Sequence, residues 1–233
     1  MSLHNDINLS RLHKLIMIDI KSNYKTIILI AATIFLFLFI MLSHETNPID
    51  NYYFILYAGG FVITSRIFNE LHDPQKASVY LMIPCSNLER FLNKWFLSAI
   101  YYAMGTLLIC YLYSLISAIL NGFSDRHPID IFSPSLWIEI WKYLILQSVV
   151  LLGAITFKKN PLIKTTFVLG LLSAVLSLFS LLVGWLFFYP NHLGQGIYMI
   201  ENSLRGWHFI FWIIIAPICW YITYLRITEY ELK

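Results

Sequence analysis

The sequence has few residues able to do chemistry inside its apolar stretches, and Glu139 and Lys142 are the clearest pair. They lie three positions apart, so a helix places them on one face. One interpretation is a polar lining for a substrate path across a membrane. The other, which the flanking Trp137 and Trp141 favour, is an interfacial ion pair with Lys142 reaching the lipid headgroups. Gln147 is a third candidate for the path, although such amides more often bond a neighbouring helix.

Motifs for enzymatic chemistry are absent from the sequence. There is no GxxxxGK[ST] phosphate-binding loop, no HExxH zinc site and no GxSxG nucleophile elbow. Cys85, Cys110 and Cys219 are far apart and form no CxxC pair, which predicts neither a disulfide nor a metal site. No series of carboxylates crosses the apolar stretches, which argues against a proton-driven carrier. We therefore expect a chain that is not itself an enzyme and binds no cofactor.

The elements that position these residues are predicted to be membrane-spanning helices. Of the 233 residues, 58% are hydrophobic and 12% are charged, whereas about one quarter are charged in soluble domains. Apolar runs of about 20 residues suffice to cross the hydrocarbon core. The predicted fold is all-α, a polytopic integral membrane protein with six transmembrane helices and an N-terminal amphipathic interfacial helix. The predicted spans cover residues 26–43, 52–68, 95–120, 136–157, 165–189 and 207–225, within one transmembrane domain at 26–225.

The N-terminal segment, residues 1–25, is too polar to span a membrane. Apolar residues recur at helical spacing in it, at Leu9, Leu12, Leu15, Ile16 and Ile20. Its Lys and Arg residues complete the pattern of a basic amphipathic helix lying in the membrane interface. A plain positively charged flank of the first span is the alternative. The first apolar run lacks a small-residue cleavage site, so we expect it to remain as an anchor.

The distribution of positive charge predicts the orientation. Thirteen of the sixteen Lys and Arg residues lie in the N-terminal segment, the loop after the second span, residues 158–164 and the tail at 226–233. The opposite side carries only Arg126 and Arg205. By the positive-inside rule, the cation-rich side and both termini are cytoplasmic. A five-span topology would move the tail to the opposite side and still leave eleven cations inside.

The loop between the second and third spans, residues 66–94, is the largest soluble connection and has local structure. Ser86 and Glu89 form an S-x-x-E capping box, which predicts a helix that starts at Ser86 and continues into the third span. Upstream, the previous helix is expected to end near 68–71, and residues 72–74 are interpreted as a turn. An ordinary connection is the alternative, but the capping box favours an ordered loop.

This loop carries a resemblance to a known family. Residues 68–72 (FNELH) and 80–91 (YLMIPCSNLERF) resemble the segment that leads into the third span of type-2 ABC exporter permeases, and the six-span topology resembles theirs over the whole chain. The specific motif covers about 25 residues. Cys85 stands where a small apolar residue is expected between the proline and the serine.

The resemblance implies a function that composition alone does not. Permeases of this family pair to form the substrate pathway, and each binds a separate ATPase subunit, which carries ATP and magnesium, through a cytoplasmic coupling helix. This implies a multi-pass protein of the bacterial plasma (inner) membrane whose partners are an ABC ATPase, a second permease copy or paralogue and the lipid bilayer, with no nucleic acid. The residues that it assigns to ATPase coupling are Phe68, Glu70, Leu71, Asp73, Pro84, Ser86, Glu89 and Arg90. Glu70 and Asp73 are expected on the exposed part of the loop.

Two other classes of function stay open. A non-transporting membrane scaffold or immunity-type protein would bind a cytoplasmic partner through the same loop. An intramembrane enzyme would need paired acids or a histidine-rich site within the spans, which the sequence lacks. The aromatic-rich spans suit a lipidic or amphipathic cargo, but contact with the bilayer explains the same residues.

Overall fold

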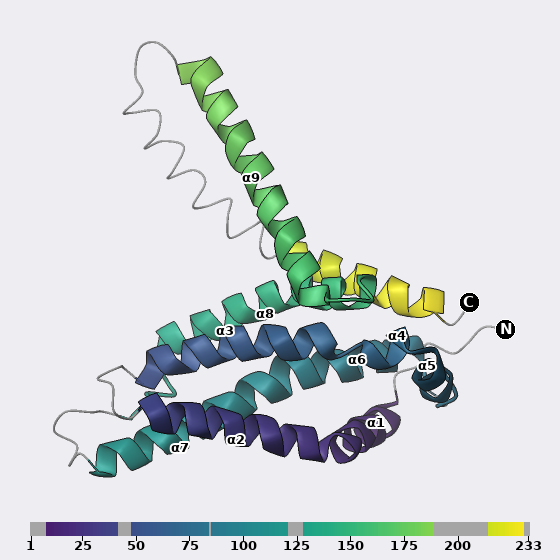
Figure 1. Cartoon of the computed structure of the whole chain (residues 1–233), viewed down its shortest axis with the longest axis vertical. Helices are drawn as coiled ribbons and strands as arrows, with labels where there is room; N and C mark the ends of the chain where they lie inside the picture. The colour runs from purple at the N-terminus through teal and green to yellow at the C-terminus, as the bar shows by residue number, and fades with distance from the viewer. Residues whose placement is uncertain (1–7, 42–47, 84, 121–127, 189–213, 231–233) are drawn as a thin grey trace.

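The chain folds into helices, and the part that the structure describes contains no strand (Figure 1). The computed structural model describes residues 8–41, 48–83, 85–120, 128–188 and 214–230. In chain order the helices are α1 (Leu9–Ser22), α2 (Tyr24–Met41), α3 (Pro48–Arg66), α4 (Asn69–His72), α5 (Pro74–Leu81), α6 (Asn87–Trp95), the π-helix η1 (Phe96–Tyr101), α7 (Tyr102–Leu120), α8 (Pro134–Thr156) and α9 (Pro161–Phe188). A further helix covers residues 214–230. The all-α prediction is confirmed.

Three helices within the described residues are long and apolar enough to cross a membrane. They are Asn87–Ile119 with 33 residues, which joins α6, η1 and α7, Pro134–Thr156 with 23, and Pro161–Phe179 with 19. A fourth candidate is α1 with α2, a pair bent by 67°. The three single helices match the third, fourth and fifth predicted spans, and the bent pair overlaps the first. At the second, α3 is not among the candidates, and the sixth begins outside the described residues.

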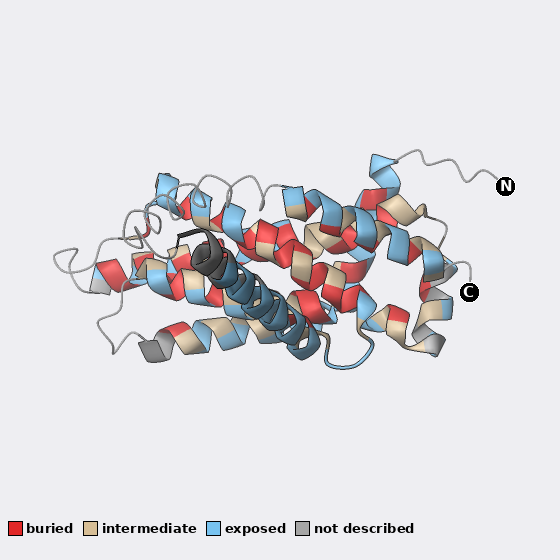
Figure 2. Ribbon diagram, turned by 90° about the horizontal axis from the view of Figure 1, so that it is seen from above, coloured by how far each residue is buried: buried red, intermediate tan, exposed pale blue. Residues whose placement is uncertain are grey.

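The core of the molecule is a bundle in which α2, α3, α7 and α8 run side by side (Figure 1). Its buried residues include large aromatic and aliphatic side chains from all four helices, among them Leu38, Tyr52, Leu56, Tyr102, Leu107, Leu136 and Tyr143. In contrast, α9 leaves the bundle after its first turns, and most of its described side chains are exposed (Figure 2). An exposed apolar helix suits contact with lipid. The last helix, at 214–230, ends near the end of the bundle that also holds α1, α4 and α5 (Figure 1).

Two tyrosines fill the space beside the paired glycines of α3. A Cβ atom on Gly60 would meet the ring of Tyr143, 2.6 Å from Cε2, and one on Gly59 would meet the hydroxyl of Tyr102. Both hydroxyls are used: Tyr102 Oη donates to the Ile55 carbonyl at 2.7 Å, and Tyr143 Oη donates to the Ser98 carbonyl at 2.9 Å. The glycines therefore let α7 and α8 place polar aromatic groups against the α3 backbone.

The loop after α3 contains a helix, α5, that the sequence analysis did not predict. Asp73 caps α5, because its Oδ1 accepts from the Gln75 amide at 3.2 Å, and Pro74 occupies the first helical position. An acidic N-cap followed by proline is a recognised helix start. The predicted turn at 72–74 is present as a bend at Asp73 between α4 and α5, whereas the helix that follows it was not predicted. Phe68, Leu71 and Tyr80 are buried against the end of α8 and the last helix, which anchors the loop to the bundle.

Candidate functional site

The loop at 66–94 is a folded unit built from α4, α5 and α6. The predicted capping box is present: Ser86 Oγ accepts from the Glu89 amide at 3.2 Å, and Glu89 Oε2 accepts from the Ser86 amide at 3.0 Å. From this cap the helix runs through η1 into α7, as predicted, although the π-helical segment was not foreseen. Pro84, one of the residues that the resemblance assigns to coupling, lies outside the described residues.

A buried charge cluster sits where this loop meets α1. Lys94 Nζ lies 2.9 Å from Asp19 Oδ2 of α1 and 2.9 Å from Glu70 Oε2 of α4. The Lys94 side chain is only 5% exposed. Asn93 Nδ2 donates to the same Asp19 oxygen at 2.7 Å. One ammonium group therefore joins three helices that are far apart in the chain. We call Asp19, Glu70, Asn93 and Lys94 the Lys94 cluster.

Tyr80 of α5 brings the fourth helix of this region to the cluster. Its ring lies 4.9 Å from Lys94 Nζ, a distance suited to a cation–π interaction. The Arg90 guanidinium lies 5.9 Å from the same ring. Burial raises the pKa of Tyr80 to about 12, against the opposing effect of Lys94, so the ring remains a neutral phenol at physiological pH.

The helix α1 is attached to α6 at a second point. Glu89 Oε1 accepts from the Asn8 amide at 2.9 Å, and Arg11 Nε lies 3.9 Å from the same oxygen. Between the two attachments, α1 buries the predicted apolar positions Leu12, Leu15 and Ile16, while Leu9 stays exposed.

The residues assigned to coupling divide into buried and surface groups. Phe68, Leu71, Glu89 and Arg90 are buried and so position the loop without offering a docking surface. Ser86 and Asp73 cap helices. Glu70 differs from expectation, because its carboxylate binds Lys94 and its side chain is 35% exposed. Among the side chains of 66–94 that the structure describes, the exposed ones are Arg66, Asn69, Gln75, Ser78 and Met82.

The three residues proposed for a substrate path do not form one lining. Lys142 Nζ lies 2.6 Å from Glu139 Oε1, with 52% of the lysine side chain exposed. Tyr57 Oη donates to Glu139 Oε2 at 2.9 Å. Gln147 is fully buried, and its Nε2 donates to Ser98 Oγ of η1 at 2.8 Å. Gln147 therefore bonds a neighbouring helix, as the sequence favoured, and Glu139 and Lys142 form the alternative ion pair.

Sequence reasoning missed Asp19, Asn93 and Lys94 as members of a site. A signal existed for Asp19, because it is the only acid between residues 9 and 25 and follows Leu12, Leu15 and Ile16 on the apolar face. An acid on an apolar face predicts a buried partner. Nothing local points to Lys94 as that partner, since 75 residues separate the two.

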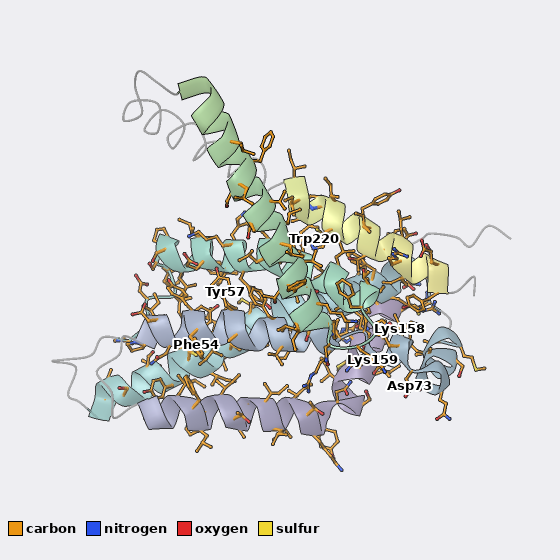
Figure 3. The ribbon with its side chains drawn as sticks, turned by 45° about the horizontal axis from the view of Figure 1, so that its top comes forward. Phe54, Tyr57, Asp73, Lys158, Lys159 and Trp220 are labelled. Atoms are coloured by element: carbon orange, nitrogen blue, oxygen red, sulfur yellow. The ribbon has the colours of Figure 1, made fainter. Side chains whose placement is uncertain are left out.

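In Figure 3, Asp73, Lys158 and Lys159 lie toward the end of the bundle that holds α5, whereas Phe54 and Tyr57 lie farther toward the other end. Two of the three cations at 158–164 thus share an end with the Lys94 cluster. Among the described residues, no group of three or more His, Cys, Asp and Glu could hold a metal ion.

The whole chain was compared with families, curated proteins and solved structures. No family model, curated protein or solved structure matches it. A function for this chain therefore rests on its own residues and their geometry.

Proposed function

We propose that this chain is the permease subunit of a type-2 ABC exporter, with six spans and both termini in the cytoplasm. The loop at 66–94 docks on a separate ATPase and passes its movement to the spans. Two permease units, identical or related, enclose the substrate pathway. The protein itself hydrolyses no ATP, in keeping with the absence of a P-loop from the sequence.

The observation that carries this proposal is the unbroken helix from the Ser86 cap into the membrane-length segment Asn87–Ile119. A helix without a break moves as a unit, so a push on its cytoplasmic end displaces the span. The preceding α4 and α5 are tied to it through Glu70 and Tyr80. A loop built in this way suits the transfer of force better than a slack connection.

The docking surface that we assign is the outer face of α5 and its end. Gln75 and Ser78 are exposed there, and Met82 is 80% exposed. An exposed methionine is typical of adaptable binding surfaces. The buried side chains beneath it, Phe68, Leu71 and Tyr80, hold this face in place.

The test is co-purification of an ABC ATPase with the full chain in nanodiscs, together with the mass of the complex. Met82→Arg places a charge on the proposed docking face and should reduce ATPase recovery at least tenfold. Phe132→Arg is the matched control, because Phe132 is an apolar residue that is also highly exposed, at 89%, in the loop predicted on the other side. A complex with two permease chains supports the paired pathway.

Other outcomes would reject the proposal. If both variants retain the ATPase equally, α5 is not the docking face. If the wild-type chain captures a partner that lacks ATPase activity, the scaffold or immunity-type function replaces the permease. A lone permease chain on one ATPase would contradict the paired pathway.

A further inference from the structure

We infer that Lys94 is a positioning residue that makes α1 and the docking helices α4 and α5 move together with the third span. The contacts behind this inference belong to the described chain itself. Its consequence for transport rests on the proposed function.

The argument begins with the geometry of the Lys94 cluster. Asp19 and Glu70 come from different helices and approach one ammonium group at equal distances of 2.9 Å. The Asp19 oxygen also accepts from Asn93 at 2.7 Å. Lys94 is thus the shared member of two ion pairs, and its loss removes the ion pairs of α6 with α1 and with α4 at once.

Burial makes the contacts of the Lys94 cluster costly to break. A buried charge that loses its partner is left without compensation, and hydrocarbon packing cannot replace that partner. Any movement that separated α1 from α6 would leave Asp19 buried without its partner. Any movement that separated α4 from α6 would take the Glu70 carboxylate away from the buried Lys94 ammonium. The movement with the lowest energetic cost therefore keeps α1, α4 and α6 together.

Hydrogen bonds connect the Lys94 cluster to the membrane-length helix and to α8. Ser98 Oγ donates to the Lys94 carbonyl at 2.9 Å, and Gln147 Nε2 of α8 donates to Ser98 Oγ at 2.8 Å. The Ser98 carbonyl accepts from Tyr143 Oη, also of α8. Ser98 lies in η1, and π-helical turns often mark functional positions. A displacement of Lys94 therefore reaches α8 through two side-chain hydrogen bonds.

The experiment is hydrogen–deuterium exchange of the full chain in nanodiscs, without any partner. Asp19→Asn removes the ion pair of α1 with Lys94 and leaves the Glu70 pair in place, so amides at 9–22 should exchange about tenfold faster while those at 69–81 stay unchanged. Glu70→Gln should give the reverse pattern. Lys94→Met should raise exchange in both segments, and Lys94→Arg should restore most of the protection.

The matched control is Lys142→Met, which removes the exposed ion pair with Glu139 and should alter neither segment. Three results would overturn the inference: unchanged exchange at 9–22 in Asp19→Asn, equal effects of Asp19→Asn and Glu70→Gln on both segments, or the same changes in the control. If Lys94→Met fails to fold, the two single carboxylate variants still decide the matter.

A second readout separates this inference from the proposed function. With the ATPase present, Asp19→Asn should keep ATPase binding, because α5 is untouched, and lower the transport-coupled ATP turnover at least fivefold. If Asp19→Asn speeds exchange at 9–22 but keeps the transport-coupled ATP turnover, the coupling part of the inference is overturned. Loss of ATPase binding in Met82→Arg bears on docking alone. If the exchange changes are selective as predicted but no ATPase co-purifies with the chain, the role of Lys94 in holding the helices together stands and the permease proposal is rejected.

Discussion

Lys94 and Lys142 each bind a carboxylate, but their surroundings differ. Lys142 pairs with Glu139 three residues away on the same helix, and half of its side chain is exposed. Lys94 pairs with residues 75 and 24 positions away, and its side chain is buried. The Glu139–Lys142 pair fixes no contact between helices, because the backbone of α8 already sets the positions of both residues. The pairs across helices define how the N-terminal helix and the loop sit on the third span.

This difference predicts opposite energetic roles. Exposed ion pairs contribute about 0–1 kcal/mol, since water and salt screen them. Removal of one member of a buried pair is far more costly, because the remaining charge has no solvent to replace its partner. The contrast can be tested with matched variants at the two sites.

The largest effect is expected from Lys94→Met. It leaves Asp19 and Glu70 without their shared cation and should lower the free energy of unfolding by about 3–5 kcal/mol. The measurement is denaturant-induced unfolding of the chain in detergent micelles, followed by helical signal. A loss below about 1 kcal/mol would place Lys94 with ordinary surface lysines.

The acids of the two regions give the second comparison. Glu89 is fully buried and accepts from the backbone amides of Asn8 and Ser86. Glu89→Ala should cost about 2 kcal/mol, because hydrogen bonds to a charged group are lost. Glu139→Ala should cost less than half as much in the same unfolding assay. Equal losses would mean that burial does not separate the two regions.

The N-caps of α6 and α8 give the third comparison. Ser86 accepts from the Glu89 amide, so Ser86→Ala should cost about 1 kcal/mol. Ser133 occupies the same position before α8, but its side chain makes no capping hydrogen bond. Ser133→Ala should therefore change stability by only a few tenths of a kcal/mol. Comparable unfolding midpoints for the two variants would contradict the assigned capping box.

Local patterns explain what the sequence could predict. Helical periodicity and apolar runs located α1, α2, α3, α7, α8 and α9, and the S-x-x-E pattern located the start of α6. The amide of Gln147 was also predicted correctly to bond a neighbouring helix. Each of these depends on residues within a few turns of one another, or on the cost of an unpaired polar group in an apolar environment.

The remaining features depend on contacts between distant segments. Asp19, Glu70 and Lys94 meet only because α1, α4 and α6 pack together, and no local spacing encodes that meeting. The helix α5 is a different case, since its local Asp-Pro start signal lies within the turn that was predicted correctly, but the helix after that turn was not predicted. Glu70 was expected on the exposed part of the loop, and its side chain is 35% exposed, but its carboxylate is bound by Lys94, 24 residues away, which no local spacing indicates.

The smallest effect is expected from Lys142→Met, and it completes the comparison. The pair with Glu139 is short, at 2.6 Å, yet the lysine side chain is 52% exposed. Its removal should change the free energy of unfolding by about 0.5 kcal/mol or less, because water replaces the lost partner. Glu139 also keeps its hydrogen bond from Tyr57 at 2.9 Å. Unfolding measured at low and at high salt provides the control, since any small contribution of an exposed pair should vanish as salt rises, whereas the penalty of Lys94→Met should persist. A large, salt-independent loss in Lys142→Met would show that this end of the bundle is shielded from water, and would return Glu139 and Lys142 to the substrate path.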